Sequence, residues 1–190
     1  MTDDPMAEDP TADIEYALDQ EYFFYGQDPS TIGKFHFPSD PVPEIEELRE
    51  SVGAPEVTYV TMTIDNRNAS ESQSIQGLDA FDEAGRKYEF QPADHLLSEW
   101  RNKLEQDEDG LTEDVEHYNA FVEVSNEHLH GPDAGELSEF TVIYDGTDLP
   151  DDLTRIAVYT SGLINEPVVA LPIDHPEAQY VDLDFEAPAT

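Results

Sequence analysis

The chain has 190 residues, with 45 Asp and Glu against 8 Lys and Arg and a formal net charge of −37. It contains no cysteine, which excludes disulfides, thiolate metal ligands and a cysteine nucleophile. Nucleic acid is disfavoured as a partner because phosphate binding needs clustered basic residues. We expect no membrane span, since no stretch approaches the roughly 20 apolar residues that cross a bilayer.

The net charge indicates the solvent in which this chain folds. In dilute buffer, like charges on one compact body repel one another and oppose folding. At molar salt the Debye length falls to about 3 Å, so most of that repulsion is screened. Apolar residues make up 38% of the chain and are patterned, which disfavours an acidic disordered polypeptide. We therefore expect a globular protein of a halophilic system.

The N-terminal quarter of the chain is expected to contain a tail and an arm. Residues 1–12 read as an acidic tail, unlike a secretory signal, which favours a chain used without export unless a signal has been removed. Residues 13–55 are expected to form an arm with the first strand or strands and a short helix at 44–51. The aromatic run 22–25 in this arm predicts either a buried core strand or a segment that docks on a neighbouring subunit.

Residues 56–162 are expected to form the core of a β-sandwich. In 57–64 the period is two, so Val60, Met62 and Ile64 share one face. Further strands are expected at 78–82, 86–90, 118–124, 139–144 and 155–159. Residues 95–105 predict a helix that follows an N-cap at Asp94 and carries Leu96, Trp100 and Leu104 on one side.

Residues 163–190 are expected to form a C-terminal strand extension, with strands at 168–171 and 180–185. Such a strand can add to the sheet edge of another chain. The candidate interface residues of the two ends are Tyr22, Phe23, Phe24, Tyr25, Tyr180 and Phe185. Evenly spaced strands separated by turn signals predict an all-β fold, an antiparallel immunoglobulin-like β-sandwich with one or two short helices inserted.

Several segments between 57 and 159 match a known pattern. They are the strand 57–64 closing in Asp65-Asn66, the segment 79–90, the turn 131–135 leading into 140–144, and the segment 148–153 before 156–158. In these segments the chain resembles the telokin-like immunoglobulin-fold domains that are common in secreted bacterial and archaeal lipoproteins. The resemblance implies an immunoglobulin-like fold, and the family has no shared catalytic residues to carry over.

The acidic loop 105–116 matches the register of a calcium-binding loop. Acids occupy positions 1, 3, 5, 9 and 12, and glycine occupies position 6, where the turn must be tight. The candidate metal ligands are Glu105, Asp107, Asp109, Glu113 and Glu116. An EF-hand needs a helix on both sides, whereas a strand is expected after this loop. A calcium or monovalent cation site and a solvated acidic loop both remain open.

The sequence has no catalytic motif, so we expect no enzyme and no cofactor apart from such a cation. The function we expect is that of a structural or assembly protein, a virion component of a haloarchaeal virus such as a capsid decoration, spike or lattice subunit. Its partners would be protein subunits, and it would be oligomeric or particle-bound in the virion. The alternative is a cell-surface or secreted ligand-binding immunoglobulin-like module of a haloarchaeon.

Overall fold

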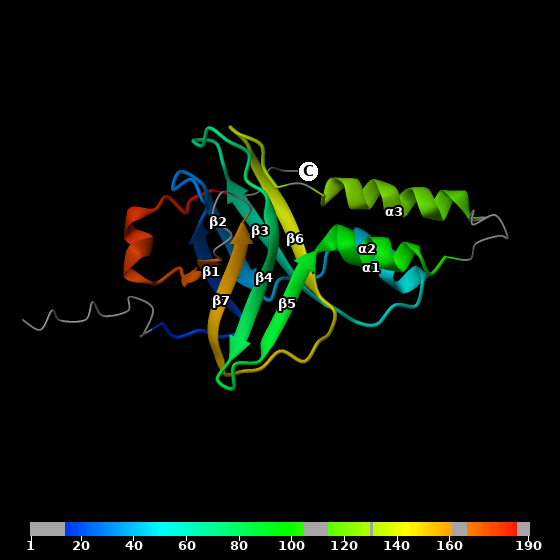
Figure 1. Cartoon of the computed structure of the whole chain (residues 1–190), viewed down its shortest axis with the longest axis horizontal. Coiled ribbons are helices and arrows are strands. Elements are labelled where there is room, and N and C mark those ends of the chain that lie inside the picture. Colours follow the sequence, from blue (N-terminus) through cyan, green and yellow to red (C-terminus); the bar gives the residue numbers. More distant parts are fainter. Residues whose placement is uncertain (1–13, 105–113, 130, 161–166, 186–190) are drawn as a thin grey trace, which may run out of the picture.

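The computed structural model describes residues 14–104, 114–129, 131–160 and 167–185. These residues form nine strands and three α-helices (Figure 1). The strands are β1 (Gln20–Tyr25), β2 (Ile32–Phe37), β3 (Thr58–Asp65), β4 (Ile75–Asp82), β5 (Lys87–Pro92), β6 (Leu137–Tyr144), β7 (Leu153–Thr160), β8 (Val168–Val169) and β9 (Leu171–Pro172). The helices are α1 (Pro43–Ser51), α2 (Ala93–Arg101) and α3 (Val115–Glu127), followed late in the chain by the short 3₁₀-helix η1 (Pro176–Tyr180).

All nine strands belong to one antiparallel sheet in the order β8-β7-β4-β5-β6-β3-β2-β1-β9. Only two residue pairs join β5 to β6, so the sheet consists of two halves with a narrow junction. At the other side, β8 pairs with β7 while β9 pairs with β1. The sheet is therefore a nearly closed barrel. The predicted antiparallel β-rich fold is confirmed, whereas an immunoglobulin-like sandwich is not confirmed.

The segment 168–173 closes the barrel because its backbone bonds to both edges. The amide of Ala170 donates to the carbonyl of Ile156 at 2.9 Å, and the amide of Ile173 donates to the carbonyl of Glu21 at 3.1 Å. From inside the barrel, the Tyr16 hydroxyl donates to the Ala170 carbonyl at 3.0 Å. The C-terminal extension thus supplies two short strands, but the strand expected at 180–185 is wrong, since η1 and irregular backbone occupy 176–185.

Large aromatic side chains fill the barrel. Tyr22, Phe24 and Phe37 are fully buried in the same cluster as Val60 and Met62, so the predicted inward face of β3 is confirmed. Each such side chain stabilises the fold by about 1.5–3 kcal/mol on burial. This burial agrees with the core interpretation of the aromatic run, and β2 pairs with β3 in the same sheet as the rest of the core.

The three helices lie together on the outside of the barrel (Figure 1). Tyr59 of β3 and Ile143 of β6 point outward and pack against Leu48, Leu97 and Phe121 of the helices. This second cluster explains why β3 and β6 carry apolar residues on both faces. Among the described residues, no helix combines the length and the apolar character that crossing a membrane requires.

The expected strand at 118–124 is wrong, because these residues belong to α3. The Asp114 side chain caps this helix by accepting a hydrogen bond from the His117 amide at 3.0 Å. Tyr118, Phe121 and Val122 then recur at helical spacing, although aromatic and β-branched residues favour strands. The other two predicted helices are confirmed with shifted ends, and Asp94 lies in the first turn of α2 rather than at its N-cap.

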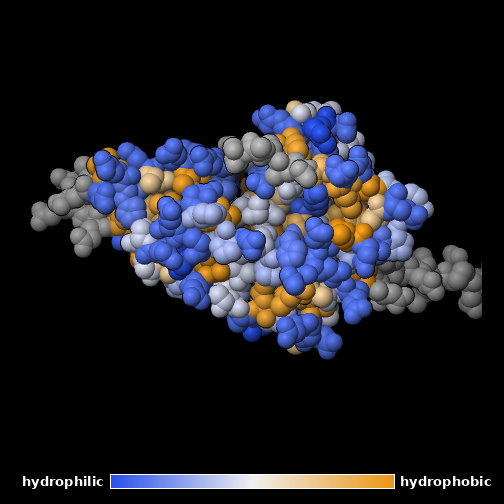
Figure 2. All heavy atoms as spheres, turned by 180° about the vertical axis from the view of Figure 1, so that it is seen from behind, coloured by the Kyte–Doolittle hydropathy of each residue, from blue (hydrophilic) through white to orange (hydrophobic). Residues whose placement is uncertain are grey.

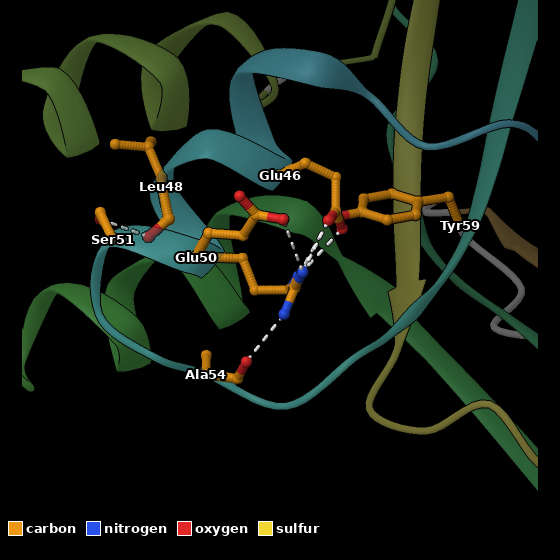
Figure 3. Close-up of polar contacts among 7 residues, drawn as sticks. Glu46, Leu48, Glu50, Ser51, Ala54 and Tyr59 are labelled. Carbon is orange, nitrogen blue, oxygen red and sulfur yellow. Dashed lines mark hydrogen bonds and ion pairs between the residues drawn. The ribbon is translucent and has the colours of Figure 1, made fainter.

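A polar network fixes α1 to β3 (Figure 3). The Arg49 guanidinium donates to the Glu46 carboxylate through Nε at 3.0 Å and Nη2 at 2.8 Å, and to the Ala54 carbonyl through Nη1 at 2.8 Å. The Tyr59 hydroxyl donates to Glu46 at 2.6 Å. Hydrogen bonding from Arg49 is the largest cause that lowers the pKa of the Glu46 carboxyl. Each group in this network therefore has its partner within the chain.

Candidate functional site

Helix α3 and its C-terminal end carry most of the large hydrophobic side chains that lie exposed among the described residues. Five large hydrophobic side chains are exposed, and three of them, Val115, Tyr118 and Leu129, lie on α3 or directly after its C-cap. Val115 is 58% exposed. Figure 2 shows that apolar areas interrupt the hydrophilic rear face, on the barrel as well as on the side of the helices. A cluster of exposed apolar side chains on so acidic a chain is a candidate contact surface.

One side of α3 is held against α1 and α2. Phe121 is its one buried residue. The His117 ring lies 2.6 Å from the Ser51 hydroxyl through Nε2, and the His128 ring lies 3.6 Å from the Glu44 carboxylate. The Arg101 guanidinium of α2 also lies 5.1 Å from the centre of the Tyr118 ring, and Ala120 and Val124 pack against the cluster that contains Phe121. Polar links, a cation–π contact and apolar packing therefore attach this helix.

The exposed apolar residues form, together with the half-buried Val122, a stripe beside that attached side. Val115, Val122 and Leu129 are spaced seven residues apart, and Tyr118 lies between them. At 3.6 residues per turn these four positions lie about 60–120° around the helix axis from Phe121, centred on about a quarter of a turn. We call Val115, Tyr118, Val122 and Leu129 the α3 stripe. Its acidic neighbours on the helix, Glu116, Glu123 and Glu127, project from the opposite flank.

Next to the stripe, Ser51, His117 and Asp114 have the residue types of a catalytic triad. The Ser51 hydroxyl donates to the Leu48 carbonyl at 2.6 Å, and its single proton cannot also be given to His117. The His117 Nδ1 atom lies 3.6 Å from the Asp114 carboxylate, which is too long for the hydrogen bond that orients a triad histidine. The contact between Ser51 and His117 links α1 to α3.

A second candidate site lies on the outer face of β4, β5 and β7. In the register of these strands, Asp79 lies between Glu89 and Ala157, and Gly77 lies opposite Tyr159. The alternate residues Leu78 and Ala80 point into the barrel. Asp79 is only 3% exposed although it points away from the barrel interior. A carboxylate that is buried on an outer face must be enclosed by its neighbours.

The neighbours of Asp79 form a charged and hydrogen-bonded row. The Lys87 ammonium lies 3.5 Å from the Asp79 carboxylate and 2.7 Å from the Glu89 carboxylate. Hydrogen bonding to Glu89 is the largest cause that raises the pKa of Lys87. Burial, followed by a hydrogen bond to Asp79, raises the pKa of the Tyr159 hydroxyl. Lys87 is therefore an ammonium held between two carboxylates.

Beside this row is a pocket of about 240 Å³, which we call the Gly77 pocket. Gly77 has φ of +154°, and a Cβ there would lie 2.7 Å from the Phe90 carbonyl oxygen. A side chain at this position would therefore push β4 and β5 apart along one wall of the pocket. Its lining includes Gln76, Gly77, Asp79, Lys87, Glu89, Gln91 and Tyr159.

The sequence reasoning missed both surfaces. A glycine inside a strand, two residues before an aspartate, is the signal that points to the Gly77 pocket. The α3 stripe is not apparent from the sequence, because Tyr118 and Val122 fall in the strand expected at 118–124 and Val115 falls in the acidic loop. With helical spacing, the repeat of seven residues becomes visible.

The structure does not test the predicted cation site. Glu105, Asp107, Asp109 and Glu113 lie outside the described residues, and Glu116 lies exposed in the first turn of α3. The loop is preceded by α2 and followed by α3, so the strand expected after it is wrong. Within the described part of the chain, no group of three His, Asp or Glu side chains could hold a metal ion. The site at 105–116 stays a prediction.

Most of the predicted interface residues are buried in their own chain. Tyr22, Phe23, Phe24 and Phe185 are 4% exposed or less. Tyr25 is partly exposed, and Tyr180 is 81% exposed. A subunit contact through the aromatic run would therefore require β1 to leave the barrel, whereas Tyr180 is accessible as the chain stands.

Comparison with protein-family models, with curated proteins and with solved structures gave no match. The resemblance to telokin-like domains therefore stays a prediction, and the case for function depends on the residues described above.

Proposed function

We propose that this protein is a non-enzymatic subunit of a larger assembly in a halophilic system, a structural component of a haloarchaeal virion. The observation that carries the proposal is the exposed α3 stripe on a chain with a net charge of −37. Water-exposed side chains of this size are favourably removed from solvent by a partner. The packed barrel interior supports the role of a rigid block.

The partner that fits the stripe is a second copy of the chain. The spacing is symmetric about Val122, with Val115 and Leu129 seven residues to either side. In an antiparallel pair of α3 helices about a twofold axis, Val115 would meet Leu129 of the partner subunit, and Val122 would meet its own counterpart. The acidic flank of each helix would face away from the seam. Molar salt screens the remaining repulsion between the two anionic bodies.

A pair of double variants tests this proposal. Val115→Asp with Leu129→Asp adds two charges to the stripe at exposed positions, so the fold should persist. Ala84→Asp with Thr147→Asp adds the same two charges at exposed positions in two loops of the barrel, away from α3.

Molar mass is measured by light scattering in about 3 M KCl, where the Debye length is below about 3 Å. We expect a dimer or larger assembly for the unmodified chain and for the Ala84/Thr147 variant, and a monomer for the Val115/Leu129 variant. A monomeric unmodified chain, or equal dissociation of both variants, would refute the assembly through α3. Detection of the native protein in purified particles rather than in the cell envelope would then test its place in a virion.

The second candidate function is that of a cell-surface or secreted ligand-binding module. The Gly77 pocket favours it, because a concave site with a few convergent polar groups is the usual form of a small-molecule site.

A further inference from the structure

The ligand class of the Gly77 pocket can be inferred from the charges around it. Lys87 already lies between Asp79 and Glu89, at 3.5 Å and 2.7 Å, so a bare cation would have to displace the ammonium. The three groups together carry one net negative charge, which disfavours an anion. A purely apolar ligand would remove water from the two carboxylates and the ammonium without replacing their hydrogen bonds. The remaining class is a neutral ligand rich in hydrogen-bonding groups.

We propose that the Gly77 pocket binds a neutral polyhydroxyl ligand, such as one sugar ring. This inference rests on the second candidate function and is independent of the assembly through α3. Glu89 presents acceptor oxygens and Lys87 an ammonium donor beside the enclosed Asp79, and Gln76 and Gln91 each present both kinds of group. A hydroxyl both donates and accepts, so adjacent hydroxyls can pair with each member of such a set.

Two further features of the pocket agree with a sugar ring. Tyr159 lines it with an aromatic side chain, and aromatic rings combine an apolar surface with a polar tip. Its volume of about 240 Å³ lies below the roughly 300–1,000 Å³ of sites for larger ligands, which limits the bound part to a single ring. Because the pocket lies on the outer face of the barrel, the rest of a longer saccharide can extend into solvent. Hydrogen bonding to a neutral ligand also tolerates molar salt better than an ion pair does.

The test measures ligand binding to the full chain at about 3 M KCl, where the Debye length is below about 3 Å. Binding is monitored through the amide signals in ¹H–¹⁵N NMR spectra. The probes are glucose, galactose and mannose, with glucosamine and glucuronate as cationic and anionic counterparts. We expect at least one neutral hexose to shift the amide signals of Gly77, Glu89 and Gln91 with saturation in the millimolar range. Glucosamine and glucuronate should each bind at least roughly threefold more weakly than that neutral hexose.

Variants separate the pocket from the remaining surface. Glu89→Gln should weaken hexose binding roughly threefold to tenfold, in line with the loss of one charge-assisted hydrogen bond. Glu83→Gln, in the turn of the same hairpin and outside the pocket lining, should bind like the unmodified chain. The Val115/Leu129 variant should also keep full binding, so failure of the assembly proposal leaves this result unaffected.

Each other outcome overturns the inference. If no hexose gives saturable shifts, the pocket does not bind this ligand class. If glucosamine or glucuronate shifts the same amide signals and binds as tightly as the neutral hexose does, the pocket binds ligands without preferring the neutral class. If Glu89→Gln and Glu83→Gln weaken binding equally, the hexose binds elsewhere.

Discussion

Replacing Arg49 by Met should destabilise the protein more than the loss of a surface ion pair does. The variant keeps much of the apolar stem but removes the guanidinium that bonds to Glu46 and Ala54. The Ala54 carbonyl then loses its side-chain donor, and Glu46 keeps only the Tyr59 hydroxyl among these contacts. The Arg49–Glu46 ion pair is therefore lost, and the Glu46 carboxylate remains without its cationic partner.

The size of the effect follows from the burial of the pair. Removing one partner of a fully buried ion pair costs about 3–5 kcal/mol. The Glu46 side chain is 26% exposed, so hydration of its carboxylate offsets part of that cost. We therefore expect Arg49→Met to lower the free energy of unfolding by about 2–3 kcal/mol. Arg67→Met is the matched control, because the Arg67–Asp65 pair has a 2.7 Å contact but an exposed arginine. Its effect should be clearly smaller.

The network also predicts a pH dependence. The pKa of Glu46 is lowered, first by hydrogen bonding from Arg49, relative to its ordinary value of 4.5. The stability that it supplies is therefore fully present above pH 4.5 and is lost as the pH falls through the lower pKa of the folded state. The difference between the unmodified chain and Arg49→Met should shrink over that acidic range.

The assay is urea unfolding in molar KCl, followed by near-ultraviolet circular dichroism, since urea leaves the ionic strength unchanged. A double-mutant cycle with Glu46→Gln isolates the pair, and we expect a coupling energy of about 1–3 kcal/mol. Additivity within about 0.5 kcal/mol, or equal effects of Arg49→Met and Arg67→Met, would refute this reasoning.

Three further predictions concern the barrel and the acidic loop. Gly33→Ala should destabilise the fold by about 1–3 kcal/mol, because the new Cβ would lie 2.1 Å from the Phe24 ring; unchanged urea midpoints would contradict this. Tyr16→Phe should lower the free energy of unfolding by about 1 kcal/mol, because it removes the hydrogen bond to the Ala170 carbonyl. A urea midpoint equal to that of the unmodified chain would show that this hydrogen bond does not stabilise the fold. Calorimetry in molar KCl should detect calcium binding by the loop 105–116 if that loop is a specific site. The absence of binding heat at millimolar calcium would exclude a specific calcium site in this loop.

Much of the fold could be predicted from alternation in the sequence. The period of two in 57–64 correctly indicated the inward face of β3, because a sheet that packs on one core imposes that period. The same rule could not distinguish a sandwich from a barrel. That difference depends on the segment 168–173, where two-residue strands pair with opposite sheet edges. Pairing over so short a stretch leaves no period to detect.

The candidate sites were less predictable for two reasons. Residues 118–124 carry aromatic and β-branched side chains, and tertiary packing against α2 decides their helical state. The Gly77 pocket brings together β4, β5 and β7, and sequence spacing does not report which strands become neighbours. By contrast, the burial of Phe24 follows directly from its apolar character.

We infer that dissolved ions make this anionic surface compatible with a folded barrel. The most direct measurement is the free energy of unfolding by urea between about 0.1 M and 3 M KCl, a range over which the Debye length falls from about 10 Å to below about 3 Å. We predict that stability rises steeply with salt and that the near-ultraviolet signal of buried Trp100 is lost below about 1 M. A cooperative transition with the same midpoint in 0.1 M and 3 M KCl would contradict the account.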